Sequence, residues 1–114
     1  MILTELEKAV LEAMCQVAPR DGEELEAQLR SVRVKSRDNS GVGFFTALEP
    51  ERSRKAVSVK VVEGVWANIK GFQDPMAFVL FLKDGFVDIL EGAAIRDSTF
   101  GVDFSTVVFE IHAA

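Results

Sequence analysis

The spacing of apolar residues near the N-terminus predicts a helix. Leu6, Val10 and Met14 recur at intervals of four residues and therefore form one apolar stripe. Thr4 is followed three residues later by Glu7, the pattern of a capping box in which each side chain bonds the other residue's backbone N–H. We therefore expect the helix to begin immediately after Thr4.

A second, shorter helix is expected over residues 22–30, where Leu25 and Leu29 share a face. The preceding turn, residues 19–22, contains Pro, Asp and Gly, and Asp21 is placed to cap this helix. Neither helix is long enough to be stable alone, so both must pack against the rest of the chain.

From residue 31 onward apolar and polar residues alternate, which is the pattern of half-buried strands. Strands are expected at residues 31–37, 42–48, 56–62, 65–70, 78–83, 86–91 and 104–111. Short turns join several of them, including Glu63-Gly64 and Asp84-Gly85. This order predicts a single α+β domain, residues 1–114, in which two N-terminal helices pack on a curved antiparallel sheet of about six to seven strands built from hairpins.

The most apolar segment, residues 78–92, is expected to be a hairpin closed by Asp84-Gly85, which favours the positive φ angles of a type I′ turn. A two-residue turn pairs Phe81 with Asp88 and Phe78 with Glu91. Alternation then assigns to the core face Phe78, Leu80, Leu82, Val87, Ile89 and Glu91. The opposite, mixed face receives Val79, Phe81, Lys83, Phe86, Asp88 and Leu90.

The two carboxylates of this hairpin have different expected roles. Asp88 lies diagonal to Lys83, so a solvated cross-strand ion pair accounts for it. Glu91, on the core face, must accept hydrogen bonds, for instance from residues 71–74, or pair with an arginine. The alternative is a carboxyl group with a raised pKa in a ligand pocket near Thr46.

The first predicted hairpin carries basic residues on one face. A four-residue turn at 38–41 pairs Arg33, Lys35 and Arg37 with Thr46, Phe44 and Val42, respectively. The other face then carries Val32, Val34, Phe45 and Ala47. Basic side chains around Phe44 could bind an anion or single-stranded nucleic acid. The alternative is a solvated strand face whose charges discourage edge-to-edge aggregation. The formal net charge of −5 favours the solvated face.

Composition narrows the classes of function. A single cysteine, Cys15, excludes an internal disulfide and a cysteine zinc motif, so we expect a cytoplasmic protein. The N-terminus does not have the pattern of a signal peptide, and no apolar run approaches the ~18 residues of a membrane span. The only histidine, His112, accompanies no nucleophile motif, and no metal-ligand spacing occurs. We expect no metal ion and no cofactor, and no motif in the sequence indicates a particular small-molecule ligand.

Two segments, "SRDNSGVGFFT" and "GFQDPMAFVLFLKDGFVDILEG", resemble a loose group of short, uncharacterised bacterial proteins. Members of that group share a GFF/YT segment followed by an FxLFxxDGxxxxLEG hairpin. The resemblance covers about half of the chain and implies a recurrent fold, without implying an activity. It points to residues 43–46 together with Glu91 and Gly92. The chain departs from the group after "LEG", where other members carry a tyrosine-rich segment and this one has no tyrosine.

These patterns favour a non-enzymatic domain that binds another protein or a second copy of itself. The apolar residues on the two mixed faces exceed what a monomer usually leaves in water, and a homodimer is the simplest partner. A small enzyme or ligand pocket using Glu91 and Thr46 is one alternative, and anion or nucleic-acid binding is another. The candidate binding residues are Glu91, Thr46, Phe44, Arg33, Lys35 and Arg37, and no catalytic residue is assigned.

Overall fold

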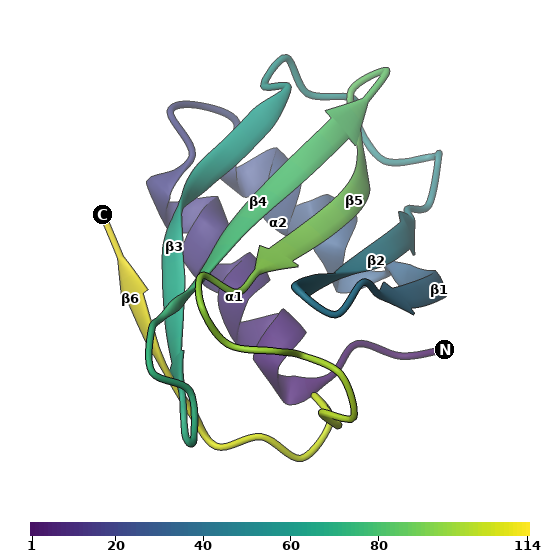
Figure 1. Cartoon of the computed structure of the whole chain (residues 1–114). Helices are drawn as coiled ribbons and strands as arrows, with labels where there is room; N and C mark the ends of the chain where they lie inside the picture. The colour runs from purple at the N-terminus through teal and green to yellow at the C-terminus, as the bar shows by residue number, and fades with distance from the viewer.

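The computed structural model describes all residues, 1–114, as two helices packed on one face of an antiparallel sheet (Figure 1). Helices α1 and α2 span Glu5–Val17 and Gly22–Arg30. The strands are β1 Arg33–Asn39, β2 Gly43–Glu49, β3 Val61–Ile69, β4 Met76–Lys83, β5 Phe86–Ala93 and β6 Phe109–Ala113. They form one six-stranded sheet in the order β1-β2-β5-β4-β3-β6, and every neighbouring pair is antiparallel. The predicted α+β fold is confirmed.

Helix α1 begins where the sequence predicts. The Thr4 hydroxyl accepts a hydrogen bond from the Glu7 backbone N–H at 3.1 Å, and the Glu7 carboxylate accepts one from the Thr4 N–H at 2.7 Å. The stripe of Leu6, Val10 and Met14 is fully buried against the sheet. The capping box therefore fixes the start of the helix, and the apolar stripe fixes which side of it faces the core.

Helix α2 also has the predicted bounds, but the predicted cap is wrong. Asp21 precedes the helix in a left-handed conformation, with φ 63°, and its side chain makes no capping hydrogen bond. Its carboxylate instead accepts hydrogen bonds from the Ser58 N–H and hydroxyl, both at 2.9 Å. Asp21 thus ties the turn between the helices to the loop that precedes β3.

The predicted hairpin at Glu63-Gly64 is wrong, because both residues lie within the single strand β3. The pairing of β3 with β4 shifts register between Val62 and Val65, so the dipeptide forms a bulge. Gly64 has φ 97°, a value that a bulge and a turn both demand and that glycine supplies. The sheet consequently has six strands, and residues 56–60 approach it as a loop.

The C-terminal strand is shorter than the predicted segment 104–111. β6 begins at Phe109, and the preceding residues form an irregular loop from Ala94. Phe104 in that loop packs its ring 4.6 Å from the ring of Phe44, measured between centroids. The loop therefore adds apolar side chains to the core instead of a strand.

The hairpin of β4 and β5 has the predicted turn and a different register beyond it. Asp84 and Gly85 adopt φ 54° and 86°, and Lys83 pairs with Phe86 as expected. A bulge at Asp88 then moves every later pair by one residue, so that Glu91 lies opposite Val79. The shift turns Leu90 into the core, where it is fully buried, and turns Ile89 and Glu91 away from it. The predicted core positions of Ile89 and Glu91 and the outward position of Leu90 are therefore wrong.

The hairpin of β1 and β2 also differs from the predicted register. Arg37 pairs with Thr46 and Asn39 with Phe44, and the ladder shifts at Lys35. Phe44 is 4% exposed in the core, whereas Phe45 is 38% exposed on the opposite face. The sequence predicts these two side chains on the reverse faces, so this prediction is wrong. Val34 is buried, and the bulge lets Arg37 face the helices as well.

Neither helix is long and apolar enough to cross a membrane.

Candidate functional site

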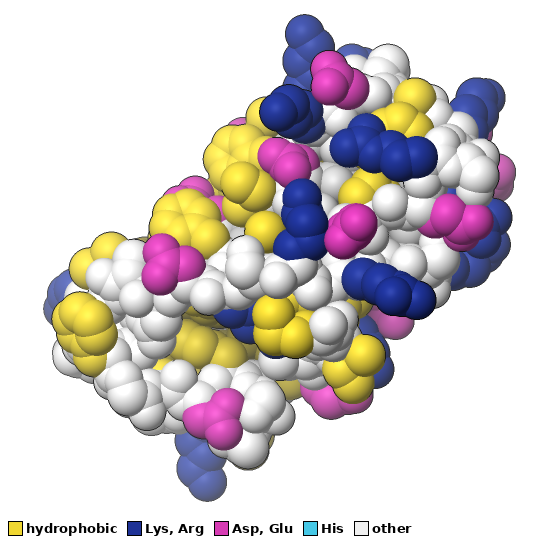
Figure 2. Space-filling model, turned by 90° about the vertical axis from the view of Figure 1, so that its right-hand side faces the viewer, with side chains coloured by type: hydrophobic (Ala, Val, Ile, Leu, Met, Phe, Trp, Pro, Cys, Tyr) yellow, Lys and Arg dark blue, Asp and Glu magenta, His cyan; other side chains and the backbone are white.

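The sheet face that points away from the helices, here called the outer face, is covered by no helix or strand (Figure 1). On the strands of this face, four large apolar side chains are partly exposed: Phe45 and Phe81 at 38%, Trp66 at 39% and Val61 at 44%. Cross-strand pairing places Ala47, Ile89, Phe81 and Val61 in one row across β2, β5, β4 and β3. In Figure 2, yellow side chains gather along the left-hand edge, where the outer face is seen in profile.

Glu91 lies in the middle of this apolar face. Its cross-strand neighbours are Phe45 on β2 and Val79 on β4. Its side chain is half-buried and forms no ion pair, since the six ion pairs of the chain all involve other residues. The face therefore contains a carboxylate with apolar neighbours and no charge partner.

Charged residues are unevenly distributed along the outer face. Asp38, Glu91 and Glu110 lie toward the end at which β2 and β4 begin. Arg33 and Lys83 lie toward the opposite end, beside the β4–β5 turn, together with Glu49. One end of the face is therefore acidic, and the other carries two basic side chains beside the carboxylate of Glu49.

The predicted ion pair between Asp88 and Lys83 does not form. Asp88 occupies the bulge of β5, which removes it from the diagonal position that regular pairing would give. Neither residue takes part in an ion pair of the structure.

Thr46 lies on the opposite side of the sheet from Glu91. It pairs with Leu90, is fully buried and donates its hydroxyl hydrogen to the Glu7 carboxylate at 2.5 Å. The structure therefore does not bring Glu91 and Thr46 together in one pocket. The carboxylate that Thr46 contacts is that of Glu7, for which the sequence predicts only a role in the helix cap.

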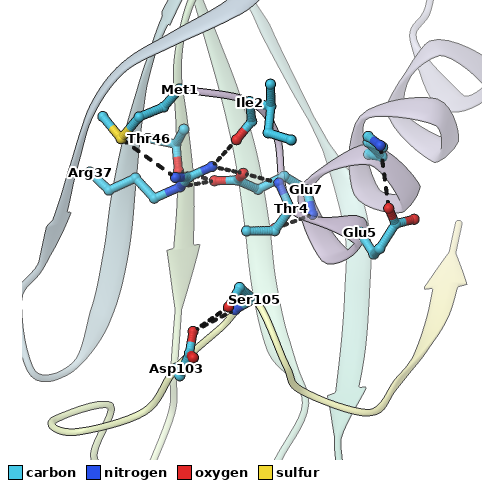
Figure 3. Close-up of polar contacts among 10 residues, drawn as sticks. Met1, Ile2, Thr4, Glu5, Glu7, Arg37, Thr46, Asp103 and Ser105 are labelled. Atoms are coloured by element: carbon cyan, nitrogen blue, oxygen red, sulfur yellow. Dashed lines mark hydrogen bonds and ion pairs between the residues drawn. The ribbon is translucent and has the colours of Figure 1, made fainter.

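Glu7, Thr46, Thr4 and Arg37 form a buried polar cluster, the Glu7 cluster (Figure 3). The Arg37 guanidinium donates to both carboxylate oxygens, with Nη2–Oε1 at 2.6 Å and Nε–Oε2 at 3.0 Å. Arg37 also donates to the Ile2 carbonyl at 2.7 Å, which ties the N-terminal segment to β1. The Glu7 side chain is 1% exposed and that of Arg37 is 30% exposed.

The Glu7 carboxyl is ionised despite its burial. Burial alone would raise its pKa, but hydrogen bonds from Arg37, Thr46 and Thr4 outweigh that effect and lower the pKa below its usual value. The hydrogen bond to Glu7 in turn raises the pKa of Arg37. Every acceptor of the carboxylate is thus engaged, and the cluster holds α1 against β1 and β2. Its geometry is that of a structural clamp.

The predicted basic face is not assembled. Arg37 is bound to Glu7, and Phe44 packs in the core between Phe78 and Phe104, with centroids 6.1 and 4.6 Å away. Arg33 and Lys35 are exposed and form no ion pair, whereas the partly exposed Arg37 side chain is paired with Glu7. The four predicted residues of this face, Arg33, Lys35, Arg37 and Phe44, therefore do not form one anion-binding surface.

Other reactive groups are scattered. No cluster of three or more His, Cys, Asp or Glu side chains is arranged to hold a metal ion. Burial, with smaller contributions from Glu26 and Glu12, raises the pKa of the Cys15 thiol to about 11, so it is protonated at neutral pH. Cys15 lines a cavity of about 560 Å³ between α1 and α2, which neither Glu91 nor Thr46 reaches.

Comparisons with family models, with curated proteins and with solved structures gave no match to this chain. The resemblance to short bacterial proteins, stated from two segments of the sequence, stays a prediction.

Proposed function

We propose that the protein is a non-enzymatic interaction domain that associates with a second copy of itself through the outer face of the sheet. The observation that supports this function is the apolar outer face, with Phe45, Phe81, Trp66 and Val61 each 38–44% exposed. Soluble monomers rarely leave so continuous an apolar surface in water, whereas interaction surfaces commonly have one. Aromatic side chains are also enriched at such surfaces.

The size of the molecule is compatible with a dimer interface of standard size on the outer face. The molecule measures 39 × 28 × 19 Å along its principal axes. A standard interface buries about 800 Å² per partner, and most of the outer face would have to take part.

The charge distribution supports a second copy as the partner. A two-fold axis that lies in the interface and runs across the strands reverses the strand direction of one copy. The basic end, with Arg33 and Lys83, then faces the acidic end, with Asp38 and Glu91, of the other copy. Two-fold contacts of this self-complementary kind are the commonest in soluble oligomers. They would also give Glu91 a charge partner.

Sedimentation equilibrium at micromolar concentrations tests this function. We expect a dimer mass for the native chain and at least a tenfold weaker association after Phe81→Ser or Glu91→Lys. The matched control is Glu23→Lys, which makes the same charge change on the exposed surface of α2 and leaves the outer face intact.

The outcome that contradicts the proposal is a monomer mass for the native chain throughout that range. Equal weakening by Glu91→Lys and Glu23→Lys would also contradict it, because association would then depend on net charge rather than on the outer face.

A further inference from the structure

A small cavity opens where β2 and β5 separate. Their ladder ends at the pair Ala47–Ile89, and bulges interrupt the adjoining pairs at Lys35 in β1 and Asp88 in β5. The cavity has a volume of about 130 Å³. Leu48 and Val87, each 1% exposed, line its apolar part. It belongs neither to the Glu7 cluster nor to the centre of the outer face.

The β5 side of this cavity is held in place by Gln28 of α2, which is fully buried. The Gln28 amide oxygen accepts a hydrogen bond from the Val87 N–H at 3.0 Å. Its amide nitrogen donates to the carbonyls of Gly85 and Lys55 at 2.8 and 2.9 Å. The first bond satisfies the Val87 N–H at a position where β5 has no partner in β2, and the other two fix the β4–β5 turn and the β2–β3 loop beside the cavity.

Three basic side chains from separate segments converge on the cavity: Lys35 of β1, Arg52 of the β2–β3 loop and Lys83 of β4. None of them forms an ion pair. The Arg52 guanidinium lies 4.8 Å from the centroid of the Phe86 ring, a cation–π contact that restricts its position.

Two carboxylates, of Glu49 and Asp88, also line the cavity, and neither lies within ion-pair distance of the three cations. Figure 2, which views this side of the molecule, shows dark blue and magenta side chains interspersed over its upper part and no continuous basic track. An extended polyanion would therefore meet carboxylates along its path, whereas a compact anion can contact the cations alone.

We propose that this cavity binds the phosphate group of a small ligand. A tetrahedral phosphate presents acceptor oxygens in several directions, which suits donors arriving from three separate segments. The cavity volume corresponds to about four water molecules at ~30 Å³ each, room for a group of phosphate size. Arg52 supplies a planar donor fork, and Lys35 and Lys83 supply point charges. Of the basic residues that the sequence suggested for anion binding, only Lys35 belongs to this set.

Titration of the ¹⁵N-labelled chain with inorganic phosphate, at constant ionic strength set with chloride, tests the inference. We expect saturable amide shifts confined to the cavity, at Lys35, Glu49, Arg52 and Val87. The variant Lys35→Gln/Arg52→Gln should weaken phosphate binding at least tenfold. The control Lys70→Gln/Arg30→Gln removes the same two charges from exposed positions outside the cavity and should change affinity less than twofold.

A parallel titration with phosphoserine distinguishes a phosphate ester from the free ion. Shifts of the same amides by phosphoserine assign the site to a phosphorylated ligand, and shifts by inorganic phosphate alone assign it to the free ion. The inference is overturned if neither compound shifts these amides, or if the control variant weakens binding as much as the cavity variant does. It does not rest on self-association, because the cavity is complete within one copy.

Discussion

At the scale of single residues, Glu7 is the only charged residue whose side chain is buried in the fold. It accepts hydrogen bonds from Thr4, Thr46 and Arg37 while being 1% exposed. Such a buried ion pair adds little compared with well-packed apolar residues, but removing one partner leaves the other charge and its neighbours unsatisfied. Substitution of Glu7 should therefore destabilise the fold more than the loss of a helix cap alone would.

We expect Glu7→Gln to lower the free energy of unfolding by about 2–4 kcal/mol, because the buried carboxylate is lost and its donors on Arg37, Thr46 and Thr4 lose a charged acceptor. Urea denaturation followed by far-ultraviolet circular dichroism measures the change. The control is Glu12→Gln on the exposed side of α1, which should cost less than about 0.5 kcal/mol. A loss equally small for both variants would show that the cluster does not stabilise the fold.

The same cluster predicts a pH dependence. The folded-state pKa of Glu7 is lowered, so its contribution is fully present above the unfolded-state pKa of about 4.3 and is lost as pH falls through the folded-state value. The difference in unfolding free energy between the native chain and Glu7→Gln should therefore be constant at pH 6–8 (about 2–4 kcal/mol) and shrink below about pH 4.

Four other carboxyl groups also have lowered pKa values: those of Asp21, Glu51, Asp74 and Asp103. Their contributions to the pH dependence are the same in both proteins, so they cancel in this difference in unfolding free energy. A difference that stays unchanged from about pH 7 to about pH 3 would contradict the assigned shift in Glu7.

At the scale of elements, three bulges decide which side chains face the helices. They lie at Lys35 in β1, at Glu63–Gly64 in β3 and at Asp88 in β5. A one-residue shift sends every later side chain of a strand to the other face. This is why Leu90 is in the core and Glu91 is on the outer face.

Packing around Gly92 provides a direct test of this face assignment. A Cβ added there would lie 2.7 Å from the Phe78 ring, 3.0 Å from the Phe44 ring and 3.1 Å from the Met76 methyl. We expect Gly92→Ala to destabilise the fold by about 1–3 kcal/mol through overpacking. Thermal unfolding measures the effect, and Ala93→Ser, at the exposed next residue, serves as control. A neutral Gly92→Ala variant would mean that Phe44 does not pack against this strand.

The sequence was sufficient for features that local chemistry specifies. The capping box at Thr4, the start of α1, the bounds of α2 and the Asp84-Gly85 turn are as predicted. It was insufficient wherever a bulge intervened, because an extra residue in a strand leaves the local alternation looking regular. The position of Glu91 depended on such a bulge. The second role of Glu7 was hidden because the capping box already accounted for its carboxylate.

At the scale of the whole molecule, the helices cover one face of the sheet and leave the other open (Figure 1). The open face combines apolar rows with Asp38 and Glu91 toward one end and Arg33 and Lys83, beside Glu49, toward the other. Apolar area provides the driving force for association, and the charge distribution would set the relative orientation of two copies. The proposed two-fold dimer uses both properties, and it leaves the α1–α2 side of each copy in solvent.

Isotope-filtered nuclear Overhauser spectroscopy on a mixture of labelled and unlabelled chains tests the self-association most directly, because it identifies the surface as well as the stoichiometry. We predict contacts between the methyl groups of Ile89 and Val79 in one copy and the rings of Phe45 and Phe81 in the other. The absence of any contact between copies, or contacts confined to α1 and α2, would contradict the account.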